Sequence, residues 1–329
     1  MKANLYIKIL LCCSLLLPGA CSDDDDKPKK STNISVVSFN IRVDNPVDGD
    51  NVWENRKAAA AAMIEYEQPT LLGLQEAQPH QITYLAKNCP DYAWYGLGRD
   101  TGECPPETDT YAAEECMVIF YRTSEVELLE KGTFWLSTMP NVPSKGWDAG
   151  YNRSCTWGLF KHKSSGRNFY FFNTHLDNSG TMARKFSLQL IAEKAREFNP
   201  EAHPMFLTAD FNSDTDETIF APLFKVMHDA RRLATVTDDR ATFNGYKETA
   251  TRKLDYFLLK LPGLSVQNTD PGLRRPLHFG PLSDKGTFRD TPDRIISSIH
   301  ETQRLYASDP ATERLFDGIR RTGARQSGL

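Results

Sequence analysis

The sequence predicts an α/β fold in which two stacked, mixed β-sheets are flanked by helices. Two observations support this fold class. A β-α-β order occupies residues 34–76, and a helical pattern followed by an apolar run repeats part of it at residues 186–207. Several short alternating runs lie between these units, which is typical of antiparallel hairpins. With 329 residues, of which 40% are hydrophobic and 25% charged, the chain can bury such a core in one large domain.

The first unit begins with a β-branched run at residues 34–39, which predicts a strand that ends at Asn40. The Ala-rich segment at residues 53–67 predicts a helix. The apolar run at residues 70–75 predicts a buried strand that ends at Glu76. This order indicates that the helix packs outside a sheet.

The rest of the domain is predicted from shorter patterns. Strands are predicted at residues 117–121, 132–136, 154–160, 168–173, 205–207 and 256–259, and a second helix at residues 186–198. No internal repeat of fixed period is visible in the sequence.

The N-terminal segment has the pattern of a secretory leader. Two lysines precede an apolar run at residues 9–17, which is too short to span a bilayer as a permanent helix. Small residues before Cys21 resemble the cleavage site of a bacterial lipoprotein, although Pro18 stands where an aliphatic residue is usual. Residues 1–21 are therefore predicted to be a signal peptide, and Cys21 to be lipidated and to anchor the chain in a membrane.

Polar residues 22–33 predict a tether between this anchor and the domain. The acidic run at residues 22–26 resembles the signal that sends some Gram-negative lipoproteins to the outer surface. We therefore expect a cell-envelope lipoprotein of the outer membrane, with surface exposure favoured over a periplasmic location. The alternative is a plain secretory leader followed by a solvated acidic linker.

Five short polar motifs each follow an apolar run. They are SFNIR at residues 38–42, GLQE at 73–76, NTHLD at 173–177, TADFNS at 208–213 and KLDY at 253–256. In this order they resemble the endonuclease/exonuclease/phosphatase superfamily, over about residues 34–267. The stretches at residues 53–56, 132–137 and 143–148, with Arg153 and Trp157 beyond, resemble its bacterial secreted-lipoprotein branch. The resemblance implies a four-layer sandwich of the α/β (α+β) type and metal-dependent hydrolysis of phosphoric esters.

Two of the motifs supply candidate metal ligands. Hard oxygen ligands hold Mg²⁺, which neutralises charge on phosphoryl oxygens, and Mn²⁺ and Ca²⁺ are alternative ions. Glu76 is the best carboxylate ligand, the alternative being a charge at the start of a helix before Pro79. Asn40 would give an amide oxygen to the metal or its water, the alternative being an Asn that turns the chain. Arg42 could pair with a carboxylate or a phosphate.

Three further residues are predicted to act on the phosphate. His175 would donate to a phosphate oxygen, although a lone strand histidine is often structural. Asp210 and Asn212 are two residues apart and so share one face of a strand. The resemblance implies that Asp210 activates water or assists the leaving group and that Asn212 binds phosphate. The alternative is an Asx-turn.

The C-terminal part departs from the family pattern. The resemblance implies that Asp255 orients the histidine of a Ser-Asp-His motif, and this chain has Ser283, Asp284 and Lys285 there. Asp284 remains a candidate catalytic residue. Lysine cannot accept and donate protons as an oriented imidazole does. Losing a general base typically costs on the order of 10² to 10⁴ in rate, so activity could be strongly reduced or absent.

Residues 268–329 also differ in composition, with nine Arg and one Lys and no strand-like apolar run. One interpretation is a genuine extension with a helix at residues 293–305. The other is a divergent or frameshifted end that has lost the last strand, and the abrupt change favours it.

The formal net charge of −4 gives no global attraction to polyanions. A small phosphorylated substrate or a lipid headgroup is therefore favoured over long nucleic acid, and we expect a monomer. The alternatives are a secreted nuclease, a catalytically impaired surface protein that binds a phosphorylated ligand, and a damaged gene product that folds poorly. Lys145 and Arg153, with nearby aromatic residues, could form a pocket for a phosphorylated ligand.

Four cysteines follow Cys21, and in an oxidising compartment they allow three pairings. Cys104 and Cys116 flank a polar stretch, so a bridge that closes this loop is predicted as one option. Cys155 is predicted to be a buried thiol.

Overall fold

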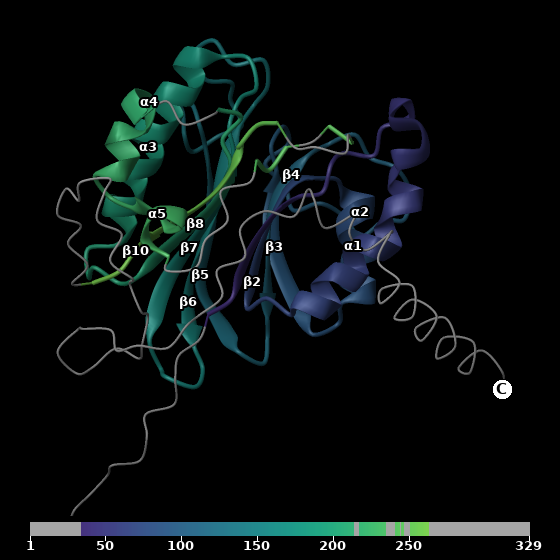
Figure 1. Cartoon of the computed structure of the whole chain (residues 1–329), viewed down its shortest axis with the longest axis horizontal. Coiled ribbons are helices and arrows are strands. Elements are labelled where there is room, and N and C mark those ends of the chain that lie inside the picture. The colour runs from purple at the N-terminus through teal and green to yellow at the C-terminus, as the bar shows by residue number, and fades with distance from the viewer. Residues whose placement is uncertain (1–33, 214–216, 235–240, 244, 247–250, 263–329) are drawn as a thin grey trace, which may run out of the picture. The chain divides into compact units, whose positions relative to one another are not determined.

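The computed structural model describes residues 34–213, 217–234, 241–243, 245–246 and 251–262. In this part of the chain two mixed sheets face each other, and helices cover their outer faces (Figure 1). The predicted four-layer sandwich of two stacked mixed sheets flanked by helices is therefore confirmed.

The first sheet has four strands in the order β1-β2-β4-β3. Only β1 and β2 run parallel among these described strands, because α1 crosses over between them. The strands are β1 (Val36–Asn40), β2 (Leu71–Ala77), β3 (Tyr92–Gly98) and β4 (Cys116–Arg122), and the helices are η1 (Pro46–Asn51), α1 (Trp53–Glu67) and α2 (Pro79–Asn88).

The second sheet has six strands in the order β5-β6-β7-β8-β10-β9. Of the strand pairs described in it, only β7 and β8 run parallel, with α3 as their crossover. The strands are β5 (Val126–Trp135), β6 (Ser154–His162), β7 (Asn168–His175), β8 (Met205–Asp210), β9 (His228–Asp229) and β10 (Asp255–Lys260), and the helices are α3 (Thr181–Phe198), α4 (Glu217–Phe224) and α5 (Ala230–Leu233).

The sequence-based prediction missed α2 and β3. Helix α2 is short and largely polar, but Pro79 starts it, and Gln78 and Gln81 form a capping box. Strand β3 contains two glycines, which lower strand propensity. One of them is required, because a Cβ on Gly96 would lie 2.3 Å from the backbone oxygen of Met117 on β4.

Helix α3 begins at Thr181, five residues before the predicted start at residue 186. Its first turn is held by Asp148, whose carboxylate accepts hydrogen bonds from the backbone of Met182 (3.2 Å) and Ala183 (2.7 Å). This capping side chain comes from a distant loop. The pattern of the helix itself therefore could not reveal the earlier start.

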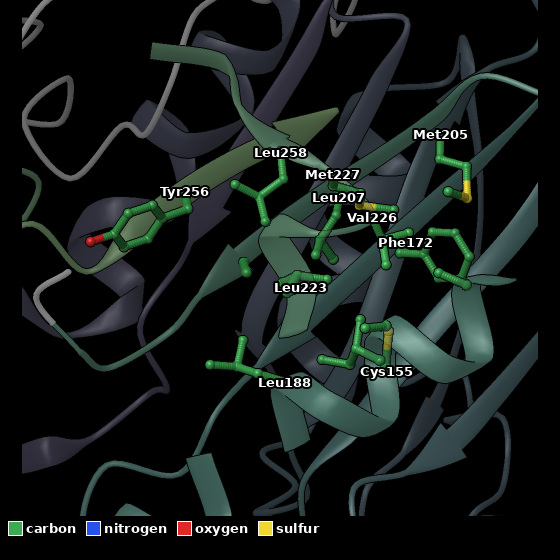
Figure 2. Close-up of a cluster of buried hydrophobic side chains, with 14 of the residues drawn as sticks. Cys155, Phe172, Leu188, Met205, Leu207, Leu223, Val226, Met227, Tyr256 and Leu258 are labelled. Atoms are coloured by element: carbon green, nitrogen blue, oxygen red, sulfur yellow. The ribbon is translucent and has the colours of Figure 1, made fainter. Parts of the chain in front are cut away.

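Three apolar clusters separate the four layers. One lies between the second sheet and its helices and includes Leu188, Leu207 and Leu223 (Figure 2). A second lies under α1 and α2, and a third lies between the two sheets. In β7, Phe172 belongs to the first cluster and Phe171 to the third, because successive side chains of a strand point to opposite faces. Burial on both faces explains the continuous aromatic run of this strand.

A buried polar network joins the sheets below the strand ends. The amide of Asn173 on β7 donates to the backbone oxygen of Leu74 at 2.8 Å. Its oxygen accepts from Gln75 at 2.7 Å and from Thr208 at 3.0 Å. A Cβ on Gly73 would lie 2.0 Å from the Thr208 hydroxyl oxygen, so only glycine allows this approach. The network fixes how the two sheets lie over each other.

The four described cysteines are free thiols, so the predicted bridge between Cys104 and Cys116 is wrong. Cys116 starts β4 and is buried in the cluster under α1 and α2, whereas Cys104 is exposed. The prediction of a buried thiol at Cys155 is confirmed, and burial raises the pKa of this thiol.

None of the described helices is both long enough and apolar enough to cross a bilayer. The predicted signal peptide at 1–21, the tether at 22–33 and the tail at 268–329 lie outside the described residues. The predictions of lipidation and of a divergent or frameshifted tail therefore stay predictions.

Candidate active site

The site residues come from the same edge of both sheets. Asn40 ends β1, and Glu76 lies near the end of its parallel neighbour β2. His175 ends β7 and pairs in register with Asp210, which ends the parallel strand β8. Asp255 begins the antiparallel strand β10 and is the second register partner of Asp210. Because these ends meet at one edge, five positions far apart in the sequence come together.

Asn40 connects the two sheets at this edge. Its amide nitrogen donates to Glu76 Oε1 and to Asp210 Oδ2, both at 2.9 Å. Its Oδ1 accepts a hydrogen bond from the backbone of Arg42 at 3.0 Å. The amide nitrogen, not the predicted oxygen, therefore faces the carboxylates. One small space thus receives a carboxylate from each sheet.

Glu76 is aimed into the site by an irregular backbone. The register between β2 and β4 shifts between Leu74 and Ala77, which is a bulge, and bulges redirect side chains next to active sites. Glu76 has a φ of 59°, a left-handed conformation that is uncommon outside glycine. Its Oε2 accepts from the backbone of Val43 at 3.1 Å and lies 3.8 Å from Arg42 Nη1.

Asp210 and Asp255 form a buried carboxylate pair, 6% and 3% exposed. Burial and the charge of Asp255 raise the pKa of Asp210, against hydrogen bonds from Asn40 and the Asn212 backbone. Burial also raises the pKa of Asp255, while a hydrogen bond with Thr242 opposes this. Two such groups are stabilised by a shared proton or by a cation.

His175 and Asn212 lie beside Asp210. The His175 Nε2 is 2.8 Å from the amide nitrogen of Asn212 and 3.6 Å from Asp210 Oδ2. The Asn212 backbone donates to Asp210 Oδ1 at 2.9 Å, and Asn212 has a φ of 49°. The Asx-turn considered for this motif is therefore present, and it is what brings Asn212 to the histidine.

The donor set fits a divalent metal ion. Ligand atoms of Glu76, His175 and Asp210 all lie within 4.8 Å of one another. Carboxylate oxygens suit Mg²⁺ and Mn²⁺, and an added imidazole also suits softer transition metals. The sequence placed Asn40 and Glu76 on the metal, and the structure adds His175 and Asp210 to the residues able to hold it. The sequence feature that could have indicated Asp210 as a metal ligand is its position at the end of an apolar strand.

Of the residues that support this edge, the sequence predicted Arg42, as one that could pair with a carboxylate, but not Arg56 or Gln81. Arg42 donates to both carboxylate oxygens of Asp48 at 2.9 Å, and this hydrogen bond raises the pKa of Arg42 against the effect of burial. Arg56 of α1 is buried and donates to the backbone oxygens of Ile41 and Arg42. Gln81 of α2 also donates to the Arg42 oxygen, at 2.9 Å. These bonds hold the chain that follows Asn40.

The remaining predicted residues lie in different settings. Arg153 is buried and lies 3.6 Å from Asp177, two residues after His175, whereas Lys145 is exposed, so the two do not share one environment. Asp284 and Lys285 lie outside the described residues, and their predicted roles stay predictions.

A model of the endonuclease/exonuclease/phosphatase family matches residues 37–284, which include every predicted site residue from Asn40 to Asp284. An uncharacterized protein of Acanthamoeba polyphaga mimivirus is 26% identical over 202 residues, which cover 58% of this chain and 70% of that protein.

Solved structures give closer matches. The mannosyl-6-phosphatase of Bacteroides thetaiotaomicron VPI-5482 is 35% identical with a TM-score of 0.63, and the match covers 69% of this chain and 85% of that one. An endonuclease/exonuclease/phosphatase family protein from Bacteroides thetaiotaomicron is also 35% identical, with a TM-score of 0.65 and coverage of 70% and 84%. The human Nocturnin catalytic domain, 18% identical with a TM-score of 0.54, shows the shared fold alone.

The matched residues span both sheets and all five strand-end motifs. Together with the similarity to structures at 35% identity, they show that this chain belongs to the endonuclease/exonuclease/phosphatase family.

Proposed function

We propose that this protein is a Mg²⁺-dependent hydrolase of phosphoric esters that is anchored to the cell envelope. The observation that carries the proposal is the Asn40 amide, which joins Glu76 of one sheet to Asp210 of the other, with His175 within 3.6 Å of Asp210. An arrangement that gathers carboxylates in a buried place costs folding free energy. That cost is expected where the carboxylates serve a cation or move a proton.

Glu76 and Asp210 would hold the ion, with Asn40 between them. When bound, a divalent ion neutralises phosphoryl oxygens and lowers the pKa of the attacking water. Asp210 would also accept the proton of that water, because it is buried at the strand end where the ion and the phosphate would meet. His175 and the Asn212 amide would donate to the phosphoryl oxygens and so stabilise the charge that develops there.

A small phosphorylated molecule is the proposed substrate. Two considerations favour it: a neighbour at 35% identity is a mannosyl-6-phosphatase, and the net charge of −4 gives no general attraction to nucleic acid. A phosphorylated sugar is the first candidate, and a lipid headgroup is the second. We further propose a monomer that is held at the membrane by a lipid on Cys21.

The test measures hydrolysis of a chromogenic phosphomonoester and a chromogenic phosphodiester by residues 22–329 with Mg²⁺. Turnover is expected to disappear with EDTA, which removes the metal ion that would neutralise the phosphate. It is also expected to disappear in Asp210→Ala, which removes a carboxylate that would hold this ion. Asp109→Ala is the matched control, since Asp109 is exposed and pairs with Lys87 on the surface. No turnover from a folded protein that binds Mg²⁺ would overturn the enzyme proposal and leave a phosphate-binding protein. Strong preference for single-stranded DNA would favour the nuclease instead.

A further inference from the structure

Arg153 is a buried cation whose hydrogen-bonding groups are unused. It precedes β6 and is 6% exposed. Within the described residues its guanidinium donates no hydrogen bond, and its Nε is fully buried without a partner. Burial lowers the pKa of this group. An unsatisfied buried guanidinium is costly, so this position calls for an acceptor other than the described residues.

Asp177 does not supply that acceptor. Its Oδ2 is 3.6 Å from Arg153 Nε, too far for a hydrogen bond. Its Oδ1 accepts from the Ser179 backbone (3.1 Å) and hydroxyl (3.0 Å) and from the Gly180 backbone (2.7 Å), and its Oδ2 accepts from the Gly150 backbone (3.1 Å). Burial alone would raise the pKa of Asp177, but these donors hold it below its usual range. The carboxylate is thus already occupied.

The other neighbours of Arg153 do not accept a hydrogen bond from it either. The Glu115 carboxylate pairs with Arg99 at 2.7 Å instead. The ring of Tyr151 lies 5.7 Å from the Arg153 guanidinium and 4.9 Å from that of Arg99. A ring face attracts a cation but accepts no strong hydrogen bond. Within the described residues, no acceptor therefore takes a hydrogen bond from Arg153.

Arg153 acts on the candidate active site from the side of β6. Cys155, two residues later, pairs with Thr174, the neighbour of His175. Burial lowers the pKa of Arg153, and the charge of Asp210 is among those that oppose this decrease. Arg42 follows β1 and lies 3.8 Å from Glu76. Of the two arginines, Arg42 is engaged by Asp48, which leaves Arg153 as the one with free donors.

We propose that Arg153 binds a non-bridging oxygen of a dianionic phosphomonoester and makes this chain selective for monoesters over diesters. The inference rests on the proposed function. A monoester near neutral pH carries almost two charges on three terminal oxygens, and a guanidinium fork matches such oxygens. A diester has one charge on two terminal oxygens. Its second organic group would replace the oxygen that Arg153 needs and leave the buried guanidinium without a hydrogen-bond acceptor.

The test compares p-nitrophenyl phosphate with bis(p-nitrophenyl) phosphate, which share one leaving group, on the full chain in detergent with Mg²⁺. Arg153→Gln is expected to lower the ratio of kcat/KM for the monoester to that for the diester by at least about 10-fold, the size of a charged hydrogen bond. Arg153→Lys is expected to restore part of the ratio, because it keeps the charge without the fork.

Arg122→Gln is the matched control. Arg122 also has a buried Nε without a hydrogen-bond partner, and it pairs with Glu125 at 3.3 Å. It ends β4, whereas the other end of this strand, at Cys116, pairs with Ala77 beside Glu76. Its replacement is expected to leave the ratio unchanged. A ratio that is equally unchanged in Arg153→Gln, with both rates lowered alike, would show that Arg153 only supports the fold and would overturn the inference.

A second measurement does not need turnover. Inorganic phosphate at pH 8 with Mg²⁺ is expected to raise the melting temperature of the wild type and of Arg122→Gln, but not of Arg153→Gln. Equal stabilisation of all three proteins overturns the inference, whatever their activity. A wild type that hydrolyses neither ester overturns the proposed function, and the phosphate shift then still decides the role of Arg153.

Discussion

At the scale of single residues, the site is governed by the buried pair Asp210 and Asp255. These residues are register partners on β8 and β10, so the fold places their carboxylates together before any ligand binds. Burial raises the pKa of both, and each stays protonated in the folded chain at a pH where the unfolded chain has lost the proton. The pair therefore links folding stability to pH.

The sign of this linkage follows from the direction in which each pKa moves. A carboxyl with a raised folded pKa contributes stability below its unfolded pKa, and this contribution is lost as the pH rises through the folded value. With EDTA present, the melting temperature is expected to fall between pH about 4 and neutrality. Asp210→Asn is expected to make this fall smaller. The unfolding free energy that this carboxyl loses with rising pH is about 1.4 kcal/mol for each pH unit that separates its folded pKa from its unfolded one.

Differential scanning fluorimetry across this pH range measures the effect, with Asp109→Asn as an exposed control. A pH dependence that is identical in wild type and Asp210→Asn would show that the pair does not hold extra protons in the folded state.

At the scale of elements, the network around Asn173 decides how the strands present the site. It joins β7, β8 and β2 just below the ends that carry His175, Asp210 and Glu76. The strands themselves were predictable, because apolar runs end at each motif. Their mutual placement was not, since it depends on hydrogen bonds between residues 98 and 99 positions apart in sequence.

Gly73→Ala tests this network. The added Cβ would lie 2.0 Å from the Thr208 hydroxyl oxygen and 2.6 Å from Asn173 Oδ1, so the sheets must move apart. We expect a loss of about 1–3 kcal/mol in unfolding free energy, measured by urea titration, and a loss of turnover. Thr208→Ala in the same chain removes the closer atom and is expected to recover part of the stability. No destabilisation by Gly73→Ala would mean that the contact between the sheets is loose.

At the scale of the whole molecule, the described residues form a two-sheet sandwich, and the family match ends at Asp284, one residue before Lys285. The proposals for the leader and the acidic tether depend on the sequence alone. They concern the location of the protein, and the net charge of −4 gives no general attraction to polyanions.

The proposed anchor can be tested by Cys21→Ser in the full chain, expressed in a Gram-negative host that processes lipoproteins. The wild type is expected in the membrane fraction and the variant in the soluble fraction, because one lipidated residue provides the attachment. Fractionation with detection by immunoblot measures this. Both proteins in the soluble fraction would contradict the lipoprotein proposal, while the sandwich and its site would be unaffected.

The sequence by itself determined the fold class, the family resemblance and most strands, and its boundaries for α1 match the structure residue for residue. It did so because these features depend on local periodicity and on short motifs that end apolar runs. The bridge predicted between Cys104 and Cys116 was wrong, because burial of Cys116 in the core is not a local property.

Tertiary structure alone decided which side chains meet. The amide bridge from Asn40 to both carboxylates, the early start of α3 on Asp148 and the unused donors of Arg153 each depend on contacts between distant segments. Strand register and the packing of one sheet on the other set these contacts. A linear pattern carries no such distances, and for this reason the sequence could name the site residues but not their arrangement.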